Sequence, residues 1–153
     1  MPADWHVRRA SLGDLEASLA LERDCAEAPH WSRSLWHAAL TGGQLGLVRM
    51  SFLAESERGV MGFAVVRCAA ALTELETVVV SSTARRRGIG NALCRTVMEW
   101  SREAGAREIE LEVRASSKGA LALYHQLGFV EQGRRRGYYR NPTEDAVLMV
   151  ARL

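Results

Sequence analysis

The segment 85–90 carries the residue types of a phosphate-binding turn. It reads Arg-Arg-Arg-Gly-Ile-Gly, follows a run of three valines, and precedes a stretch with helical periodicity. At a helix N-terminus the first backbone N–H groups lack partners, and glycine lets the backbone approach a phosphate closely. The segment lacks the Gly-Lys-Ser/Thr ending of a Walker A loop and the three glycines of a dinucleotide-binding fingerprint. It predicts a pyrophosphate cradle, and the alternative is a basic, solvated turn before an ordinary helix.

A carboxylate that could accept a proton lies in the alternating segment 108–114. Aliphatic residues at every second position there predict a β-strand with one buried face. Glu108, Glu110 and Glu112 share the opposite face. Their spacing alone favours a solvated strand face over catalysis. A base would nevertheless be needed for an N-terminal amine, because a group with a pKa of about 8 is mostly protonated near neutral pH.

The elements that would position these residues predict a single mixed α/β domain over 1–153. The strand–helix–strand unit around the glycine segment must be parallel with a right-handed crossover, and helices should cover both faces of the mixed sheet. An arginine- and tyrosine-rich connection is expected between the last two strands. The expected strands are 7–10, 45–54, 60–68, 72–80, 108–114, 129–133 and 146–153, and the expected helices are 12–25, 33–40, 89–104 and 118–127.

Polar residues and glycines mark the ends of the expected helices. Ser32 is positioned to cap the second helix, and Gly42 and Gly43 are positioned to end it. Ser116 or Ser117 is expected to cap the last helix. The helix boundaries therefore rest on local chemistry as well as on apolar periodicity.

Composition narrows the classes of function. With 48% hydrophobic and 25% charged residues, the chain has the balance of a soluble globular protein, and we expect it in the cytoplasm. A net charge of +2 is too mild to make nucleic acid the main partner. No apolar run approaches the roughly 20 residues of a membrane span, and we see no signal peptide. Scattered cysteines and histidines predict buried thiols and no metal site: Cys25, Cys68, Cys94, His30, His37 and His125.

The glycine segment resembles a known family. Arg85-x-x-Gly88-x-Gly90 matches the Gln/Arg-x-x-Gly-x-Gly/Ala signature of the GNAT acetyltransferases. The segments 111–129, 135–139 and 145–149 resemble the bacterial RimI enzymes within that superfamily. The resemblance is close over 73–153 and loose over the first seventy residues. It implies the GNAT fold, a central mixed sheet with a splayed pair of parallel strands, and acetyl-CoA as co-substrate.

The resemblance also implies which residues would hold acetyl-CoA. Backbone groups of the valine run would bind the pantetheine arm, and the glycine segment would bind the pyrophosphate. Ser117 matches a position that is commonly asparagine in RimI-like sequences, and its alternative role is that of a helix N-cap. The implied cofactor-binding residues are Val78, Val79, Val80, Arg85, Arg86, Arg87, Gly88, Ile89, Gly90, Ser117 and Tyr124.

Two residues match the catalytic positions of the family. Glu112 matches the general base, and the resemblance reverses for this residue the interpretation as a solvated face. Tyr124 matches the general acid that would protonate the CoA thiolate, and the alternative is a core tyrosine on an apolar helix face. Glu76, on the preceding strand, is a second candidate for the base.

Aromatic and basic residues follow near the C-terminus. The resemblance implies that Tyr138 and Tyr139 help to line the peptide groove, and the alternative is surface aromatics at a strand end. The arginines 134–136 could reach the phosphates of CoA, but their pattern favours a solvent-facing position.

The resemblance implies transfer of an acetyl group to the N-terminal amine of a protein by direct attack in a ternary complex. Similarity to RimI points to the N-terminal alanine of the eighteenth small-subunit ribosomal protein. One alternative is acetylation of a small-molecule amine or a lysine side chain. Another is a non-catalytic acyl-CoA-binding or ribosome-associated module. We expect no direct nucleic-acid partner, no membrane partner and no metal.

Overall fold

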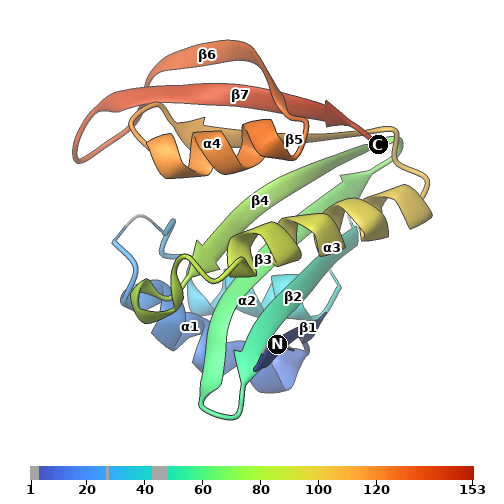
Figure 1. The fold of residues 1–153 in the computed structure, drawn as a ribbon, viewed down its shortest axis with the longest axis vertical. Coiled ribbons are helices and arrows are strands. Elements are labelled where there is room, and N and C mark those ends of the chain that lie inside the picture. Colours follow the sequence, from blue (N-terminus) through green and yellow to red (C-terminus); the bar gives the residue numbers. More distant parts are fainter. Residues whose placement is uncertain (1–3, 27, 43–47) are drawn as a thin grey trace.

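The chain forms a seven-stranded mixed sheet in the order β1-β2-β3-β4-β5-β7-β6, flanked by helices (Figure 1). The computed structural model describes residues 4–26, 28–42 and 48–153. Short 3-10 turns at Leu12–Asp14 and Ser82–Ala84 precede α1 and α3. The strands are β1 (Trp5–Arg9), β2 (Val48–Ser56), β3 (Gly59–Ala69), β4 (Leu72–Val80), β5 (Glu108–Arg114), β6 (Val130–Tyr139) and β7 (Glu144–Arg152), and the helices are α1 (Leu15–Arg23), α2 (Arg33–Leu40), α3 (Ile89–Glu103) and α4 (Lys118–Gln126).

The strands β4 and β5 form the parallel pair of the sheet, and they separate along their length. Their pairing runs from Leu72↔Glu108 to Glu74↔Glu110 and ends there. The register of β4 with β3 shifts at the same place, where Val65 pairs with Thr77 and Val66 with Leu75, so that Glu76 is the bulged residue. A bulge bends its strand and increases the local twist. Beyond it β4 remains paired with β3 while β5 pairs with β7, and the two strands diverge (Figure 1).

Helices cover both faces of the sheet, as the sequence predicts. On one face α3 and α4 bury the larger core, which includes Leu93, Val97 and Tyr124 together with the aliphatic residues of β5. On the other face α1 and α2 bury a smaller core around Trp36 and Phe63. Because side chains alternate along β5, its three glutamates lie on the face opposite α3 and α4.

A buried carboxylate joins α1 to α2 in the smaller core. The indole Nε1 of Trp36 donates a hydrogen bond of 3.1 Å to Oε1 of Glu22, and both side chains are buried. The other oxygen of Glu22 and the hydroxyl of Ser18 are buried without a hydrogen-bond partner among the described residues. Trp36 also packs edge-on against Phe63, with ring centroids 4.6 Å apart. The single indole bond thus compensates much of the cost of burying Glu22.

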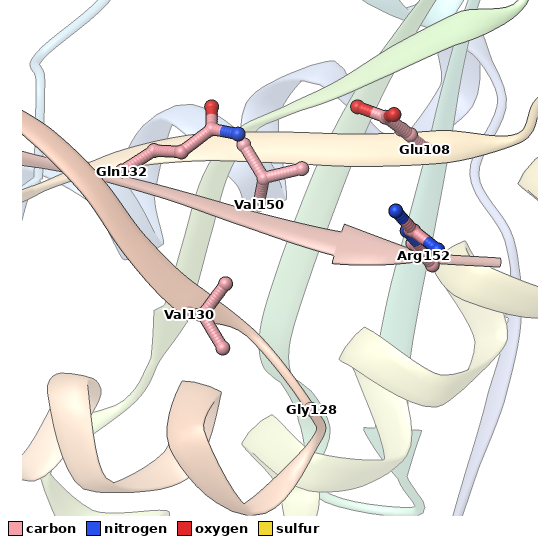
Figure 2. A pocket seen from close by; sticks show the side chains of 6 residues that line it. All are labelled: Glu108, Gly128, Val130, Gln132, Val150 and Arg152. Atoms are coloured by element: carbon pink, nitrogen blue, oxygen red, sulfur yellow. The ribbon is translucent and has the colours of Figure 1, made fainter.

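A surface depression of about 400 Å³ lies over β5, β7 and β6, away from the helices α1 and α2. Figure 2 shows Val130 and Val150 at its floor and Glu108 and Arg152 at its rim. None of the residues that the sequence assigns to catalysis, cofactor or substrate lines it.

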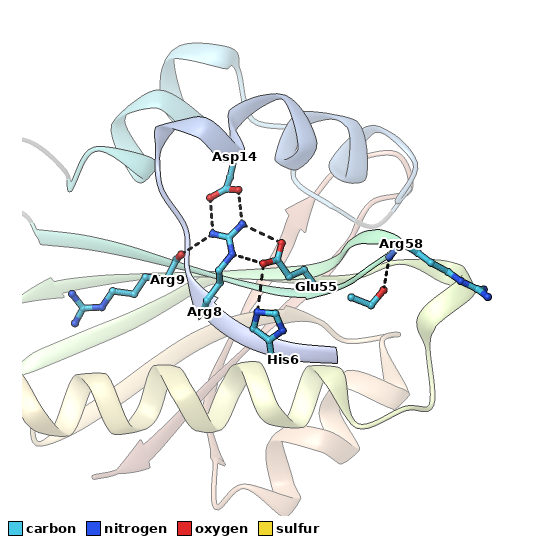
Figure 3. Close-up of polar contacts among 7 residues, drawn as sticks. His6, Arg8, Arg9, Asp14, Glu55 and Arg58 are labelled. Carbon is cyan, nitrogen blue, oxygen red and sulfur yellow. Dashed lines mark hydrogen bonds and ion pairs between the residues drawn. The ribbon is translucent and has the colours of Figure 1, made fainter. Parts of the chain in front are cut away.

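The start of α1 is fixed to β1 and β2 by an arginine that bridges two carboxylates (Figure 3). Arg8 donates to Glu55 Oε1 at 2.6 Å and to both oxygens of Asp14, at 2.8 and 3.0 Å. Asp14 also accepts a 2.8 Å hydrogen bond from the backbone N–H of Ser11, as the capping pattern predicts. This cluster sets the direction in which the chain leaves β1.

Most expected elements are confirmed, and two expected boundaries are not tested. The ranges 72–80 and 108–114 are strands as predicted, and Ser32 caps α2 through a 3.2 Å hydrogen bond from the backbone N–H of Leu35. The expected start of the second strand at 45–47 and the expected helix stop at Gly43 lie outside the described residues.

The predicted end of the sixth strand at residue 133 is wrong, and the arginine- and tyrosine-rich segment expected to connect it to the next strand belongs to the strand itself. The strand β6 continues to Tyr139, because its backbone pairs with β7 as far as Tyr139↔Glu144. Tyr138 and Tyr139 therefore lie at the end of an edge strand. No helix among the described residues is long and apolar enough to span a membrane.

Candidate active site

The valine run offers an open backbone edge beside the diverging strands. Val78, Val79 and Val80 pair with Ala64, Phe63 and Gly62 of β3 along one edge. Their other edge faces β5, and in the described chain the β4–β5 pairing ends at Glu74. Free N–H and C=O groups on this edge can form hydrogen bonds with amides of an extended ligand, as pantetheine has.

The glycine segment has the geometry of an anion-binding turn. Gly88 is the N-cap of α3 in the left-handed conformation, with φ +81°, and Arg86 also has a positive φ of 64°. The first helical bond in this turn is from the N–H of Ala92 to the carbonyl of Gly88, so the N–H groups before Ala92 point out of the helix. Ile89 is buried and anchors the turn.

Gly90 is placed where a side chain would meet both flanking elements. A Cβ on Gly90 would lie 3.4 Å from Cδ2 of Leu123 on α4 and 3.8 Å from Cγ2 of Val80. The glycine thus lets the first turn of α3 lie close to the end of β4. The exposed backbone, the helix terminus and the three exposed arginines fit a diphosphate, although Arg87 already pairs with Asp4.

The alternating glutamates do not share one environment. Glu108 is exposed, whereas Glu110 and Glu112 are partly buried, so the interpretation as a solvated face holds for Glu108. Burial, followed by the carboxylates of Glu74 and Glu112, raises the pKa of Glu110 above its ordinary value. The side chain of Glu112 is 23% exposed, and its Oε1 lies 3.5 Å from Nη2 of Arg135. Glu112 thus lies just beyond the end of the β4–β5 pairing and remains partly accessible.

Glu76, the second candidate for the base, is engaged by two arginines. Arg49 donates to both of its oxygens at 3.1 to 3.2 Å, and Nε of Arg67 lies 3.4 Å from Oε1. Its side chain is only 9% exposed. This arrangement ties the bulge of β4 to β2 and β3 and leaves little room for an amine at Glu76.

Tyr124, on α4, faces the larger core. Its ring packs against Phe129 with centroids 5.7 Å apart, and the residue is 9% exposed. Burial, with a smaller contribution from Cys94, raises the pKa of the Tyr124 hydroxyl above its ordinary value. Among the described residues, its hydroxyl makes no hydrogen bond. The phenol thus keeps its proton at neutral pH and has it available for transfer.

Ser117 occupies the N-cap position of α4, one of the two roles that the sequence allows. Its backbone carbonyl accepts the N–H of Leu121 at 2.9 Å, but its side chain makes no capping hydrogen bond. The hydroxyl is thus free to meet a ligand at the start of α4.

Tyr138 and Tyr139 form an aromatic pair held by arginines. Their rings are edge to face at 5.2 Å, and Cζ of Arg114 lies 4.4 Å from the centroid of Tyr139. Arg114 itself pairs with Glu144 at 3.3 Å. Burial first, and then the Glu112 carboxylate, raise the pKa of Tyr139 to about 12. Arg114, two residues after Glu112 on β5, thus brings the Tyr139 ring to that strand.

Two arginines lie beside the candidate residues in a way that the sequence did not predict. Arg135 is exposed, as the sequence pattern favours, but it also pairs with Glu112. Arg114 was given no role and lies over the ring of Tyr139. Only the strand register brings them together, because Arg135 and Arg114 both pair with Ala146 of β7. Arg134 and Arg136 are exposed, as expected.

The described residues contain no group of three or more side chains that could hold a metal ion. The candidate site offers carboxylates, phenols, guanidinium groups and backbone amides.

Comparison with known proteins identifies the family. The chain matches the model of the acetyltransferase (GNAT) family over residues 5–129. It is 30% identical over 140 residues to the ribosomal protein bS18-alanine N-acetyltransferase of Escherichia coli K12, with 89% of each chain covered. The crystal structure of the ribosomal-protein-S18-alanine N-acetyltransferase from Escherichia coli has a TM-score of 0.84 at 27% identity, covering 97% of this chain and 93% of that chain. Arabidopsis thaliana NAA60 in complex with acetyl-CoA shares the fold, with a TM-score of 0.86 at 21% identity and coverage of 97% and 98%.

These matches span the diverging strands, the glycine turn and the positions of Glu112 and Tyr124. They agree with the open edge of β4 and with the anion-binding start of α3. The chain belongs to the acetyltransferase (GNAT) family and is an acetyl-CoA-dependent N-acetyltransferase.

Proposed function

We propose that the chain transfers the acetyl group of acetyl-CoA to the N-terminal α-amine of a protein, with the N-terminal alanine of ribosomal protein bS18 as the physiological acceptor. The observation that carries the proposal is the position of Glu112, a partly exposed carboxylate beyond the end of the β4–β5 pairing. The name of the Escherichia coli relative, which matches over 89% of both chains, supports this acceptor.

The proposed reaction needs two proton transfers by residues of this chain. Glu112 accepts a proton from the acceptor ammonium, directly or through a water molecule, so that the nitrogen lone pair becomes available. Bound acetyl-CoA supplies the thioester carbonyl carbon that the amine attacks. As the C–N bond forms and the C–S bond breaks, Tyr124 donates its proton to the leaving sulfur. The nitrogen loses its second proton to solvent, and solvent reprotonates the Tyr124 phenolate. No covalent acetyl-enzyme is formed, and both substrates are bound at once.

Positioning of the two substrates accounts for most of the expected rate enhancement. The backbone of Val78, Val79 and Val80 would align the pantetheine arm, and the turn at Gly88 and Gly90 would hold the diphosphate. Ser117 is placed to contact the same ligand from the start of α4. Tyr138 and Tyr139 would line the path of the acceptor peptide toward Glu112.

Mass spectrometry of peptides incubated with the enzyme and acetyl-CoA tests the proposal. An Ala-initiated peptide with the bS18 N-terminal sequence should gain one acetyl group, and the same peptide with a blocked N-terminus should gain none. Acetylation confined to lysine side chains or small amines would refute the N-terminal assignment. Binding of CoA without turnover of any amine would instead indicate a non-catalytic module.

A matched pair of variants tests the role of Glu112. Glu112→Gln should lower kcat by about 10²-fold or more, since a general base contributes about 10²–10⁴-fold, and should leave the KM for acetyl-CoA unchanged. Glu108→Gln is the control, because it removes the same charge from the exposed end of the same strand face. Equal rates for the two variants would remove Glu112 from the mechanism.

A further inference from the structure

Arg135 lies beside the carboxylate of Glu112, the candidate base. Its Nη2 is 3.5 Å from Oε1 of Glu112, across the β7 strand that separates β6 from β5. The side chain of Arg135 is 55% exposed, whereas that of Glu112 is 23% exposed. The pair therefore joins a movable surface cation to a more enclosed carboxylate.

The guanidinium of Arg135 also contacts an aromatic ring on the same strand. Cζ of Arg135 is 5.4 Å from the ring centroid of Tyr138, within the range of a cation–π contact. The Tyr138 ring is itself held edge to face against Tyr139, whose other neighbour is Arg114. Arg135 can thus leave Glu112 without losing all of its favourable contacts.

We propose that Arg135 is a positioning residue that occupies the place of the acceptor ammonium in the free enzyme, and that it leaves Glu112 but keeps its contact with Tyr138 when the acceptor binds. This inference rests on the proposed function, in which Glu112 receives a proton from the acceptor amine. Two cations at one carboxylate oxygen repel each other, so the ammonium and the guanidinium compete for it. A neutral, already acetylated N-terminus brings no charge and does not displace Arg135.

The exchange keeps Glu112 paired with a cation both before and after the acceptor binds. Without an acceptor, Glu112 keeps a cationic partner and a fixed orientation. With an acceptor, the ammonium replaces that partner at little cost, because the ion pair is long and half exposed and such pairs are weak. The product, a neutral amide, loses the competition and allows Arg135 to return.

Steady-state kinetics with an Ala-initiated peptide that carries no other charged side chain tests this exchange. Arg135→Gln should lower the KM for the peptide by about two- to fivefold, as expected for loss of a weak competing ion pair, with kcat and the KM for acetyl-CoA unchanged. Arg135→Lys should restore the wild-type KM because it keeps the competing charge. An unchanged or raised KM in Arg135→Gln would overturn the proposal.

Arg136→Gln is the matched control for net charge. Arg136 is the next residue of β6, is exposed, and makes no ion pair among the described residues. The substitution Arg136→Gln removes the same charge as Arg135→Gln, so both variants share any general effect of the surface potential on a cationic peptide. The same fall in KM for Arg136→Gln as for Arg135→Gln would show a general charge effect and refute the specific exchange.

A double-mutant cycle tests the contact between Arg135 and Tyr138. Because Tyr138 is also proposed to line the acceptor path, Tyr138→Leu should raise the KM for the peptide in both backgrounds. The rise should be larger in the wild-type background, where Arg135 also loses its contact with the ring, than in the Arg135→Gln background. An equal rise in both backgrounds would refute the role of Tyr138 in holding Arg135.

Calorimetry separates this inference from the proposed function. The enzyme saturated with CoA is titrated with the free-amine peptide and with its N-acetylated form. Arg135→Gln should tighten binding of the free-amine peptide by the same factor and leave the acetylated peptide unaffected, whether or not turnover occurs. Equal changes in affinity for both peptides would refute the exchange. Tighter binding of the free-amine peptide alone, together with no acetylation of that peptide in the presence of acetyl-CoA, would refute only the proposed function.

Discussion

Gly62 on β3 lies beside the end of β4 that we propose to bind acetyl-CoA. Its replacement by alanine should lower the stability of the fold and weaken acetyl-CoA binding. Gly62 pairs with Val80. A Cβ at this position would lie 2.8 Å from the backbone oxygen of Val79 and 3.2 Å from both Cγ2 of Ile89 and Cδ1 of Leu93. The nearest atom belongs to the backbone, so rotation of a side chain cannot relieve the contact.

The size of the effect follows from these contacts. Overpacking in a well-packed core costs about 1–3 kcal/mol, which for a domain of this size corresponds to a fall in Tm of roughly 2–12 °C. The displaced atoms belong to Val79, on the strand that faces acetyl-CoA, and to Ile89, in the first turn of α3. We therefore expect the KM for acetyl-CoA to rise while the KM for the peptide stays close to its wild-type value.

Thermal denaturation and steady-state kinetics measure both effects, and Gly133→Ala is the control. Gly133 is also a strand glycine, but its added Cβ would meet only Cδ1 of Leu148 at an ordinary 3.7 Å. This variant should be neutral or slightly more stable, because alanine reduces the conformational entropy of the unfolded chain. If Gly62→Ala matches Gly133→Ala in Tm and in the KM for acetyl-CoA, the reasoning from backbone contact is wrong.

Three further predictions concern the two cores and the α1 junction. Trp36→Phe removes the 3.1 Å bond to the buried Glu22 and should cost about 2–3 kcal/mol in denaturant unfolding; an unchanged midpoint would contradict this. Tyr124→Phe should lower kcat by about 10²-fold with Tm nearly unchanged, because its hydroxyl has no hydrogen bond in the described chain, whereas a loss of stability alone would indicate a core role. Arg8 holds the pKa of Asp14 below its ordinary value, so the ion pair stabilises the fold at pH values above that ordinary pKa, and the stabilisation is lost as the pH falls through the folded-state pKa. The unfolding free energies of wild type and Arg8→Gln should therefore converge in acid. A constant difference between them would refute this role of Arg8.

The strands of the parallel pair could be predicted from sequence because their signals are local. The alternation in β5 and the valine run of β4 bury one face each, and the structure confirms both ranges. The glycine turn was equally readable, since the positive φ of Gly88 favours a residue without a side chain. These features depend on residues that lie next to one another along the chain.

The length of β6 could not be predicted in the same way. The glycines after residue 132 have little strand preference, so the sequence predicted that the strand ends at residue 133 and is followed by an arginine- and tyrosine-rich connection. Pairing with β7 supplies the backbone partners that local preference does not, and the strand extends to Tyr139. Tertiary context therefore decided where Tyr138 and Tyr139 lie.

The sequence by itself determined the class of the fold and the glycine turn, because each is encoded in short-range periodicity or in a contiguous motif. Glu112 and Tyr124 became the candidate base and acid only through the resemblance to the family, since their spacing alone favours a solvated strand face and a core tyrosine. Only the tertiary structure decided which cations meet the carboxylates. Arg135 reaches Glu112 across one strand, and Arg49 reaches Glu76 across another. Such pairs depend on strand order and register, which arise from long-range packing and are not encoded at either residue.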